Sequence, residues 1–203
     1  MRVKICGVTT VEDAKFIESC GADAVGVVIS DESLRNVTFE RAGEIFSGLG
    51  PFIAKVVVTH TTSAEELERI AALCPTAIQI STGLPMPEGY RGDVIRVIKP
   101  GMSLPESCDA VILDESRGCG IPYNGSAAKE FVRSAKVPLI LAGGLNPSNV
   151  AAAIDEVHPY AVDVCSGVEL RPGIKDKQKV MEFLKACGKM PELKLKSRYV
   201  NNL

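Results

Sequence analysis

Two residues of this sequence, Cys6 and Asp114, have the chemistry needed to move protons on a small substrate. Each ends a short apolar run, and the two runs lie far apart in the chain. A thiol at such a position, with an arginine such as Arg35 nearby, can have its pKa lowered enough to take a proton from carbon. A carboxylic acid across the pocket can donate a proton to a leaving oxygen. One base and one acid suffice to isomerise a sugar through an enol-like intermediate, without a metal or an organic cofactor.

A second set of residues is suited to binding phosphate. Gly143 and Gly144 follow an apolar run, and without a Cβ their N–H groups can approach an anion closely. Asn146, followed by a proline, is expected to open a helix that runs through Ile154, and Ser166-Gly167 is expected to form a turn after the next run. Helix and turn both add N–H donors. Tight turns alone are the alternative, but two such loops in succession favour a phosphate site.

The runs that carry these residues have the character of parallel strands. They are short, rich in Val and Ile, and alternate with more polar stretches, as expected for strands covered on both faces. Eight strands are predicted: Val3–Cys6, Ala24–Ile29, Phe52–Thr59, Ala77–Ile80, Val94–Ile98, Ala110–Asp114, Leu139–Ala142 and Ala161–Val164.

The stretches between the strands differ in helical character. Ser63, with Glu66 three residues later, indicates a capping box. Gly83–Arg91 and Pro100–Cys108 are rich in Gly and Pro, so turns or single helical turns are expected after the fourth and fifth strands. Apolar residues at helical spacing predict helices over Val11–Cys20, Thr38–Gly48, Ser63–Leu73 and Lys175–Ala186.

This alternation predicts an α/β fold, a single (β/α)₈ barrel (a TIM barrel) over residues 1–188 with shortened helices after strands four and five. An open doubly wound sheet is the alternative, but no Gly-x-Gly-x-x-Gly follows the first strand. Residues 189–203 lack periodicity and are predicted to be a mobile or surface-draped tail. Active sites of such barrels lie at the C-terminal ends of the strands. The residues expected to meet there are Cys6, Arg35, Gln79, Asp114, Asp163 and the two glycine loops.

The composition limits the classes of molecule that the protein is expected to bind. Charged residues make up 24% of the chain and the net charge is −2, so no basic field favours nucleic acid. The apolar runs are too short to cross a membrane, and the N-terminus lacks a signal-peptide core, so a cytoplasmic location is expected. Seven cysteines without Cys-x-x-Cys spacing argue against disulfides or zinc. The partner is expected to be a small phosphorylated sugar, bound by a monomer or a homodimer.

Several motifs resemble those of the phosphoribosylanthranilate isomerases of tryptophan biosynthesis. The likeness covers residues 1 to about 188 and is most specific in its first and last motifs. The motifs are Lys4-Ile5-Cys6-Gly7-Val8-Thr9, Ser33-Leu34-Arg35-Asn36-Val37, Leu113-Asp114, the stretch from Leu141 to Val150, and the stretch from Val162 to Glu169 running on to Asp176.

The resemblance implies an Amadori rearrangement of N-(5'-phosphoribosyl)anthranilate to 1-(2-carboxyphenylamino)-1-deoxyribulose 5-phosphate. In that reading Asp114 protonates the ring oxygen, and the Cys6 thiolate then removes the proton from C2 of the Schiff base. Arg35, Gln79 and Asp163 would position the substrate or the catalytic groups. The phosphate would be held by Gly143, Gly144, Asn146, Ser166 and Gly167.

Two segments depart from the family's pattern. The family usually has Gln-Leu-His-Gly at the fourth strand, where this chain has Gln79-Ile80-Ser81-Thr82. After the sixth strand the family usually has Gly-Gly-x-Gly-Lys-x-Phe-x-Trp, where this chain has residues 118–126 and no tryptophan at all. Within that segment Tyr123 either supplies an aromatic contact or has no ligand role. His60 is either a histidine at the barrel mouth or a loop cap, whereas His158 is expected to be structural.

These departures leave alternatives open. A diverged paralogue that processes a different phosphosugar would keep the same barrel and phosphate site. A non-catalytic phosphosugar-binding protein is a third possibility. Retention of both Cys6 and Asp114 argues against pure binding, which needs neither a thiol nor an acid at those positions.

Overall fold

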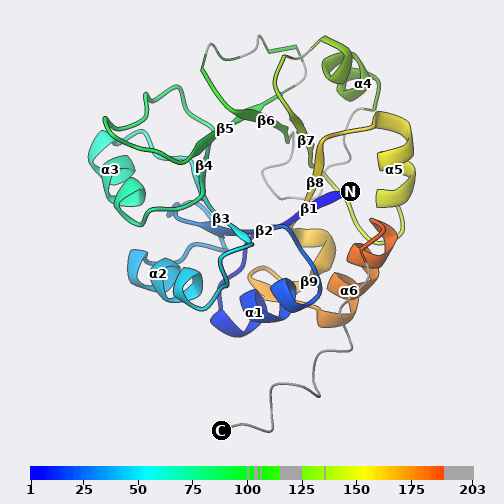
Figure 1. Cartoon of the computed structure of the whole chain (residues 1–203), viewed down its shortest axis with the longest axis horizontal. Coiled ribbons are helices and arrows are strands. Elements are labelled where there is room, and N and C mark those ends of the chain that lie inside the picture. The colour runs from blue at the N-terminus through cyan, green and yellow to red at the C-terminus, as the bar shows by residue number, and fades with distance from the viewer. Residues whose placement is uncertain (100, 103–104, 106, 115–124, 135, 190–203) are drawn as a thin grey trace, which may run out of the picture.

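The protein is a closed barrel of eight parallel strands with helices around the outside (Figure 1). The structure is a computed structural model, and it describes residues 1–99, 101–102, 105, 107–114, 125–134 and 136–189. Each strand pairs with the next along the chain, and β8 pairs with β1 over Arg2↔Ala161 to Ile5↔Val164, which closes the ring. The predicted barrel is therefore confirmed, and the open sheet is excluded.

The strands lie close to their predicted positions. β3 begins at Ala54, two residues later than predicted, because Pro51 and Phe52 lie in a turn and the Phe52 side chain is 99% exposed. Cys6 and Asp114 come directly after β1 and β6. The bounds are β1 Arg2–Ile5, β2 Ala24–Val28, β3 Ala54–Thr59, β4 Ala77–Ile80, β5 Asp93–Ile98, β6 Ala110–Leu113, β7 Leu139–Leu141 and β8 Ala161–Val164.

Most helices begin at a side-chain N-cap that the sequence supplies. Ser63 Oγ accepts the Glu66 N–H at 3.2 Å, as its predicted capping box requires. The Glu66 carboxylate, however, accepts from Thr61 Oγ1 at 2.6 Å, so only half of that box forms. The helices are α1 Val11–Ser19, α2 Phe39–Ser47, α3 Ala64–Ala72, α4 Gly125–Ser134, α5 Val150–Val157 and α6 Lys177–Ala186.

The outer ring of helices is incomplete on one side. No helix joins β4 to β5, and the residues described between β5 and β6 contain none, as predicted (Figure 1). Helix α4 was not predicted. Lys189 forms an ion pair with Asp23 at 2.7 Å. Residues 115–124 and 190–203, which include Tyr123 and most of the predicted tail, lie outside the described residues. No helix among the described residues is long and apolar enough to span a membrane.

The predicted start of the helix at Pro147 is wrong, because α5 begins at Val150. Asn146 Oδ1 accepts both the N–H of Ser148 at 2.9 Å and its Oγ–H at 2.6 Å, and these bonds hold a turn before the helix. The helix ends at His158, which takes the left-handed conformation (φ 53°) as the C-cap. This gives His158 the structural role expected of it.

A small hairpin between β8 and α6 was also not predicted. It follows a 3₁₀ turn, η1 (Ser166–Val168), and consists of β9 (Glu169–Arg171) and β10 (Ile174–Lys175), which pair antiparallel. Lys175 therefore belongs to a strand, and α6 begins two residues later than predicted, with Asp176 as its N-cap. The hairpin extends the end of β8 at the barrel mouth.

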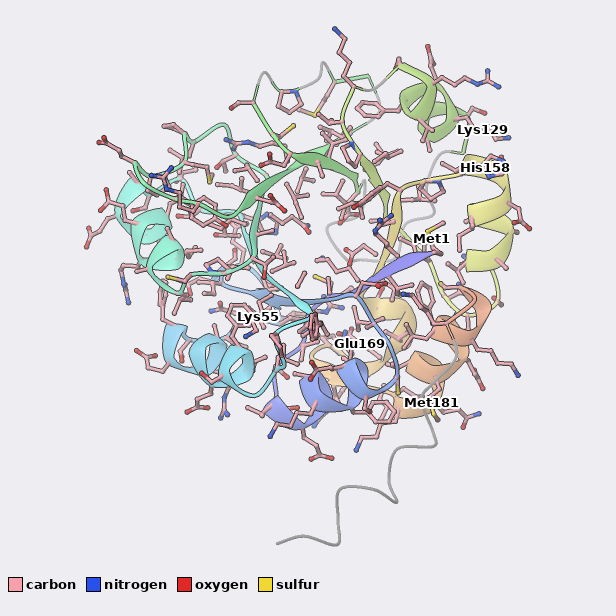
Figure 2. The ribbon with its side chains drawn as sticks, viewed as in Figure 1. Met1, Lys55, Lys129, His158, Glu169 and Met181 are labelled. Atoms are coloured by element: carbon pink, nitrogen blue, oxygen red, sulfur yellow. The ribbon has the colours of Figure 1, made fainter. Side chains whose placement is uncertain are left out.

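The core has two layers, which follow from the alternation of strand side chains. One layer lies between strands and helices and includes Val3, Ile5 and Phe183. The other includes Ile112 and Cys6. Figure 2 shows side chains filling the interior of the ring of strands. Because Val3 and Ile5 face the helices, the alternate residues of this strand segment, Lys4 and Cys6, face the interior.

Candidate active site

A pocket at the C-terminal ends of the strands brings together the predicted catalytic and substrate-binding side chains. Cys6, Arg35, Gln79, Asp114 and Asp163 all line it. They come from β1, the loop after β2, β4, the end of β6 and β8. His60 and Cys165 line the same pocket. The structure thus brings the predicted side chains together in one pocket. Four neighbouring groups were not singled out from the sequence: Lys4, Cys165, Glu169 and Lys175.

The first missed group is Lys4, which lies below Cys6 inside the barrel. Its Nζ is 2.9 Å from Asp163 Oδ1, and the two side chains are 4% and 8% exposed. A Cβ added to Gly26 would lie 3.0 Å from Cys6 Sγ and 3.2 Å from Lys4 Nζ, so the sulfur and the ammonium group pack against the same glycine. The signal in the sequence is that Lys4 stands two residues before Cys6 and therefore shares its face of the strand.

The pKa values of this pair reflect burial and mutual charge. Burial raises the pKa of Asp163 to about 7, although Lys4 opposes the shift. Burial lowers the pKa of Lys4, but Asp163 and Cys6 outweigh it and the net shift is upward. Lys4 is therefore a permanently charged group beneath the cysteine.

Cys6 is set up to be a thiolate. Its side chain is 6% exposed, and such burial raises the pKa of a thiol. The adjacent Cys165 thiol, together with the charges of Lys4 and Lys175, outweighs burial and lowers the pKa of Cys6 well below its usual value. A thiolate held in a pocket is a competent base toward carbon.

Arg35 is held in place by Glu169, the second missed group. The arginine donates from Nε to Glu169 Oε1 at 2.9 Å and from Nη2 to Oε2 at 2.7 Å, a bidentate pair. Lys175, also missed, donates to Glu169 Oε1 at 2.9 Å from a fully buried side chain. Burial acts against the charge of Glu169, but Arg35 and Lys175 outweigh it and lower its pKa. Within the described part of the chain, Arg35 Nη1 has no hydrogen-bond partner.

Gln79 offers an acceptor to the pocket. The residue is 4% exposed, and its Oε1 has no hydrogen-bond partner among the described residues. A buried carbonyl without a donor is costly, which indicates that a ligand supplies one. Beside it, His60 Nδ1 lies 2.7 Å from Ser81 Oγ, so the serine that departs from the family's pattern contacts the histidine at the end of β3.

The two predicted phosphate loops lie against each other. Gly143 and Gly144 have φ of 94° and 61°, a conformation that side chains disfavour. A Cβ on Gly167 would collide with the carbonyl oxygen of Leu145, so the turn after β8 packs onto the loop after β7. Among the described residues, the N–H groups of Gly143, Gly144, Ser166 and Gly167 donate to no protein acceptor. Four unpaired donors on adjoining loops make a site for an anion.

A family model described as N-(5'-phosphoribosyl)anthranilate (PRA) isomerase matches residues 3–186. The chain belongs to this family. The PRA isomerase of Methanoregula boonei is 54% identical over 189 residues, which cover 92% of this chain and 96% of that protein. The resemblance predicted from the motifs is thereby confirmed.

Solved PRA isomerase structures agree with this assignment. The crystal structure of the Thermus thermophilus enzyme is similar with a TM-score of 0.83 and 32% identity, covering 93% of this chain and 98% of that one. A further PRA isomerase structure, in complex with reduced 1-(o-carboxyphenylamino)-1-deoxyribulose 5-phosphate, has a TM-score of 0.78 and 33% identity over 93% and 99% of the two chains.

Replacing Gly167 by alanine should weaken phosphate binding. The added methyl group meets the Leu145 carbonyl, so the two loops must separate and their N–H groups diverge. We expect at least about a tenfold weaker affinity for inorganic phosphate, equivalent to about 1.4 kcal/mol, measured by calorimetry. Gly43→Ala in α2, where a Cβ meets nothing within 4 Å, is the matched control and should bind phosphate normally. Equal affinity in both variants would contradict a phosphate site at these loops.

Replacing Lys4 by methionine should destabilise the fold in a pH-dependent way. Removing one partner of a buried ion pair costs about 3–5 kcal/mol, because the other charge is left buried and unpaired. Asp163 has a raised pKa in the folded state, so the stability linked to its proton is complete below its ordinary pKa of 3.8 and is lost as the pH rises through about 7.

The decrease in the free energy of unfolding caused by Lys4→Met should therefore be larger at pH 8 than at pH 5. Urea unfolding at the two pH values measures it. Arg41→Met is the control, because its ion pair with Glu44 is 2.7 Å long, comparable to the 2.9 Å of Lys4 and Asp163, but both of its side chains are more than half exposed. The free energy of unfolding of Arg41→Met should change much less. A loss in Lys4→Met that is the same at both pH values would argue against a buried, unpaired carboxylate.

Proposed function

We propose that the chain performs PRA isomerisation with Cys6 as the base and Asp114 as the acid. The observation that carries this assignment is their shared pocket: the two residues follow β1 and β6, and a buried ammonium group, Lys4, lies beneath the cysteine. The similar structure in complex with a reduced form of the product supports a phosphorylated ligand at this mouth. Family membership supports the same reaction.

The chemistry begins with two proton transfers, one by the acid and one by the base. Asp114 donates a proton to the ring oxygen of N-(5'-phosphoribosyl)anthranilate, and the C1–O bond breaks to give a protonated Schiff base. The Cys6 thiolate then removes the proton from C2, and the electron pair of that C–H bond neutralises the iminium nitrogen. The resulting enolamine takes a proton at C1 and loses one from its C2 hydroxyl, which yields the 1-deoxyribulose ketone.

Three side chains bind and orient the substrate in this proposal. Arg35, fixed on one edge by Glu169, offers Nη1 to a negatively charged group of the substrate such as the anthranilate carboxylate. Gln79 Oε1 accepts from a substrate hydroxyl or amine. Asp163 keeps Lys4 in place under Cys6.

The phosphate is bound by the N–H groups of Gly143, Gly144, Ser166 and Gly167. Asn146 supports the phosphate site by holding the shape of the loop. Its N–H donates to Asn149 Oδ1 at 2.8 Å, and its side chain forms hydrogen bonds with Ser148 and with the Gly144 carbonyl. We also propose that the enzyme is cytoplasmic and that it is a monomer or a homodimer.

The test is a fluorescence assay of N-(5'-phosphoribosyl)anthranilate consumption by the purified protein. We expect turnover that inorganic phosphate inhibits competitively, because phosphate occupies the same N–H groups. A folded protein that binds phosphate but does not consume this substrate would contradict the assignment. It would favour either a different phosphosugar or a phosphosugar-binding role, which a panel of phosphorylated pentoses would separate.

A further inference from the structure

Cys165 lies beside Cys6 at the mouth of the barrel, and the mechanism above gives it no task. Their proximity follows from the register of β1 and β8, in which Ile5 pairs with Val164 and the Cys6 N–H donates to the Val164 carbonyl at 2.8 Å. Paired strands lie about 4.8 Å apart. Two positions earlier, Lys4 and Asp163 are paired in the same register and their side chains meet inside the barrel.

The same alternation places the Cys6 and Cys165 side chains on the pocket side, and both line it. A Cβ on Gly7, the residue after Cys6, would lie 2.7 Å from Cys165 Sγ, so the second sulfur packs against the backbone next to the first. The two sulfurs therefore occupy adjacent positions in one layer, above the layer of Lys4 and Asp163.

Their surroundings differ in charge. The S–H of Cys165 donates to Glu169 Oε1 only over 3.9 Å, a long contact even for sulfur. That oxygen already accepts from Arg35 Nε at 2.9 Å, from the Gly173 N–H at 3.2 Å and from Lys175 Nζ at 2.9 Å, so the S–H is available to another acceptor. Arg35 and Lys175 keep this carboxylate ionised. A negative charge beside a thiol favours its protonated form.

Cys6 Sγ instead packs near Lys4 Nζ, and a positive charge favours the thiolate. Lys175, whose Nζ donates to the Cys165 carbonyl at 3.3 Å, lowers the pKa of Cys165, but its charge is offset by the ion pair with Glu169 at 2.9 Å. The proton of the pair therefore belongs on Cys165.

We propose that Cys165 is a positioning residue whose S–H donates a hydrogen bond to the Cys6 sulfur, orienting it and holding it as a thiolate. This inference rests on the proposed role of Cys6 as the base. In agreement with it, the neighbouring Cys6 and burial both raise the pKa of Cys165, while Cys165 is the largest influence lowering the pKa of Cys6.

Other groups also face the Cys6 sulfur or its pocket, and they stay in place when only Cys165 is changed. They are Lys4 on β1, Arg35 after β2, His60 after β3, Asp114 after β6, Asp163 on β8, and Glu169 and Lys175 on the hairpin β9–β10.

The first test measures Cys6 without any substrate. The rate at which iodoacetamide alkylates Cys6 is followed against pH by mass spectrometry, after reduction and removal of the reductant under nitrogen. Trypsin releases residues 5–15, a peptide in which Cys6 is the only cysteine. We expect the midpoint of the profile to rise by at least about one pH unit in Cys165→Ala, a tenfold change in the thiol–thiolate equilibrium. Cys165→Ser keeps a donor and should restore most of the shift.

The second test asks whether turnover follows the same group. The acidic limb of the kcat/KM profile should move upward with pH in Cys165→Ala by the same amount, with little change in KM. Cys74→Ala, at an exposed turn, is the control and should leave both profiles unchanged.

An alkylation midpoint that is unchanged in Cys165→Ala would overturn the inference, even if activity fell, because the residue would then act only by filling space. A serine variant that behaves like alanine would overturn it too, since a donor would not be what matters. Loss of the proposed function is distinguishable: if Cys6→Ala still turned over substrate, Cys6 would not be the base, yet the alkylation profiles would still report on the pair.

Discussion

Replacing Cys6 by alanine should reduce kcat by about 10³-fold or more, with little change in KM. A general base typically contributes 10²- to 10⁴-fold to a reaction, and here it must remove a proton from carbon. Cys6→Ser should be nearly as inactive, because a serine hydroxyl does not ionise at neutral pH. Initial rates in the fluorescence assay, with circular dichroism to verify folding, measure the effect.

The control for this prediction is Cys20→Ala. Cys20 is 4% exposed, a burial similar to that of Cys6, but it lies at the end of α1, outside the pocket. It should retain nearly full activity. Similar kcat values for the two alanine variants would mean that Cys6 is a packing residue and that the base lies elsewhere.

Replacing Asp114 by asparagine should reduce kcat by about 10²- to 10³-fold, because an amide cannot protonate the ring oxygen and the furanose ring stays closed. The side chain keeps its size, and the Asp114 N–H can still donate to the Ile98 carbonyl at 3.3 Å, so binding and folding should change little. A substrate analogue whose chain is already open would not need this acid and should bind the variant as it binds the wild type.

The matched control is Asp93→Asn, the same chemical change at an exposed position at the start of β5, the opposite end of the strands. It should behave as the wild type does. If Asp114→Asn lost binding of phosphate as well as turnover, its role would be structural rather than that of an acid.

The barrel and its mouth were predictable because their signals are local. A strand covered on both faces needs a continuous apolar run, and a loop that bends at φ of 94° needs a glycine such as Gly143, whatever the rest of the chain does. Cys6 and Asp114 stand out for the same reason, since each is a reactive group that follows such a run.

The partners of these residues were not predictable from local signals. Glu169 and Arg35 are 134 positions apart, and nothing in either neighbourhood indicates the other. The hairpin β9–β10 is too short and too exposed to carry a burial pattern, with Leu170 68% exposed. At Asn146 a local rule failed because the side chain accepts two hydrogen bonds from Ser148 and holds a turn, and the helix begins only at Val150.

The pairing of β1 with β8 has a consequence for the order of events during synthesis. Lys4 and Asp163 are 159 positions apart, so at about 5–20 residues per second the ribosome needs on the order of ten seconds or more to make the partner strand. Contacts of such long range also form slowly during folding. Until then Cys6 lacks the strand that buries it, and the nascent chain exposes to cellular oxidants the thiol on which its later activity depends.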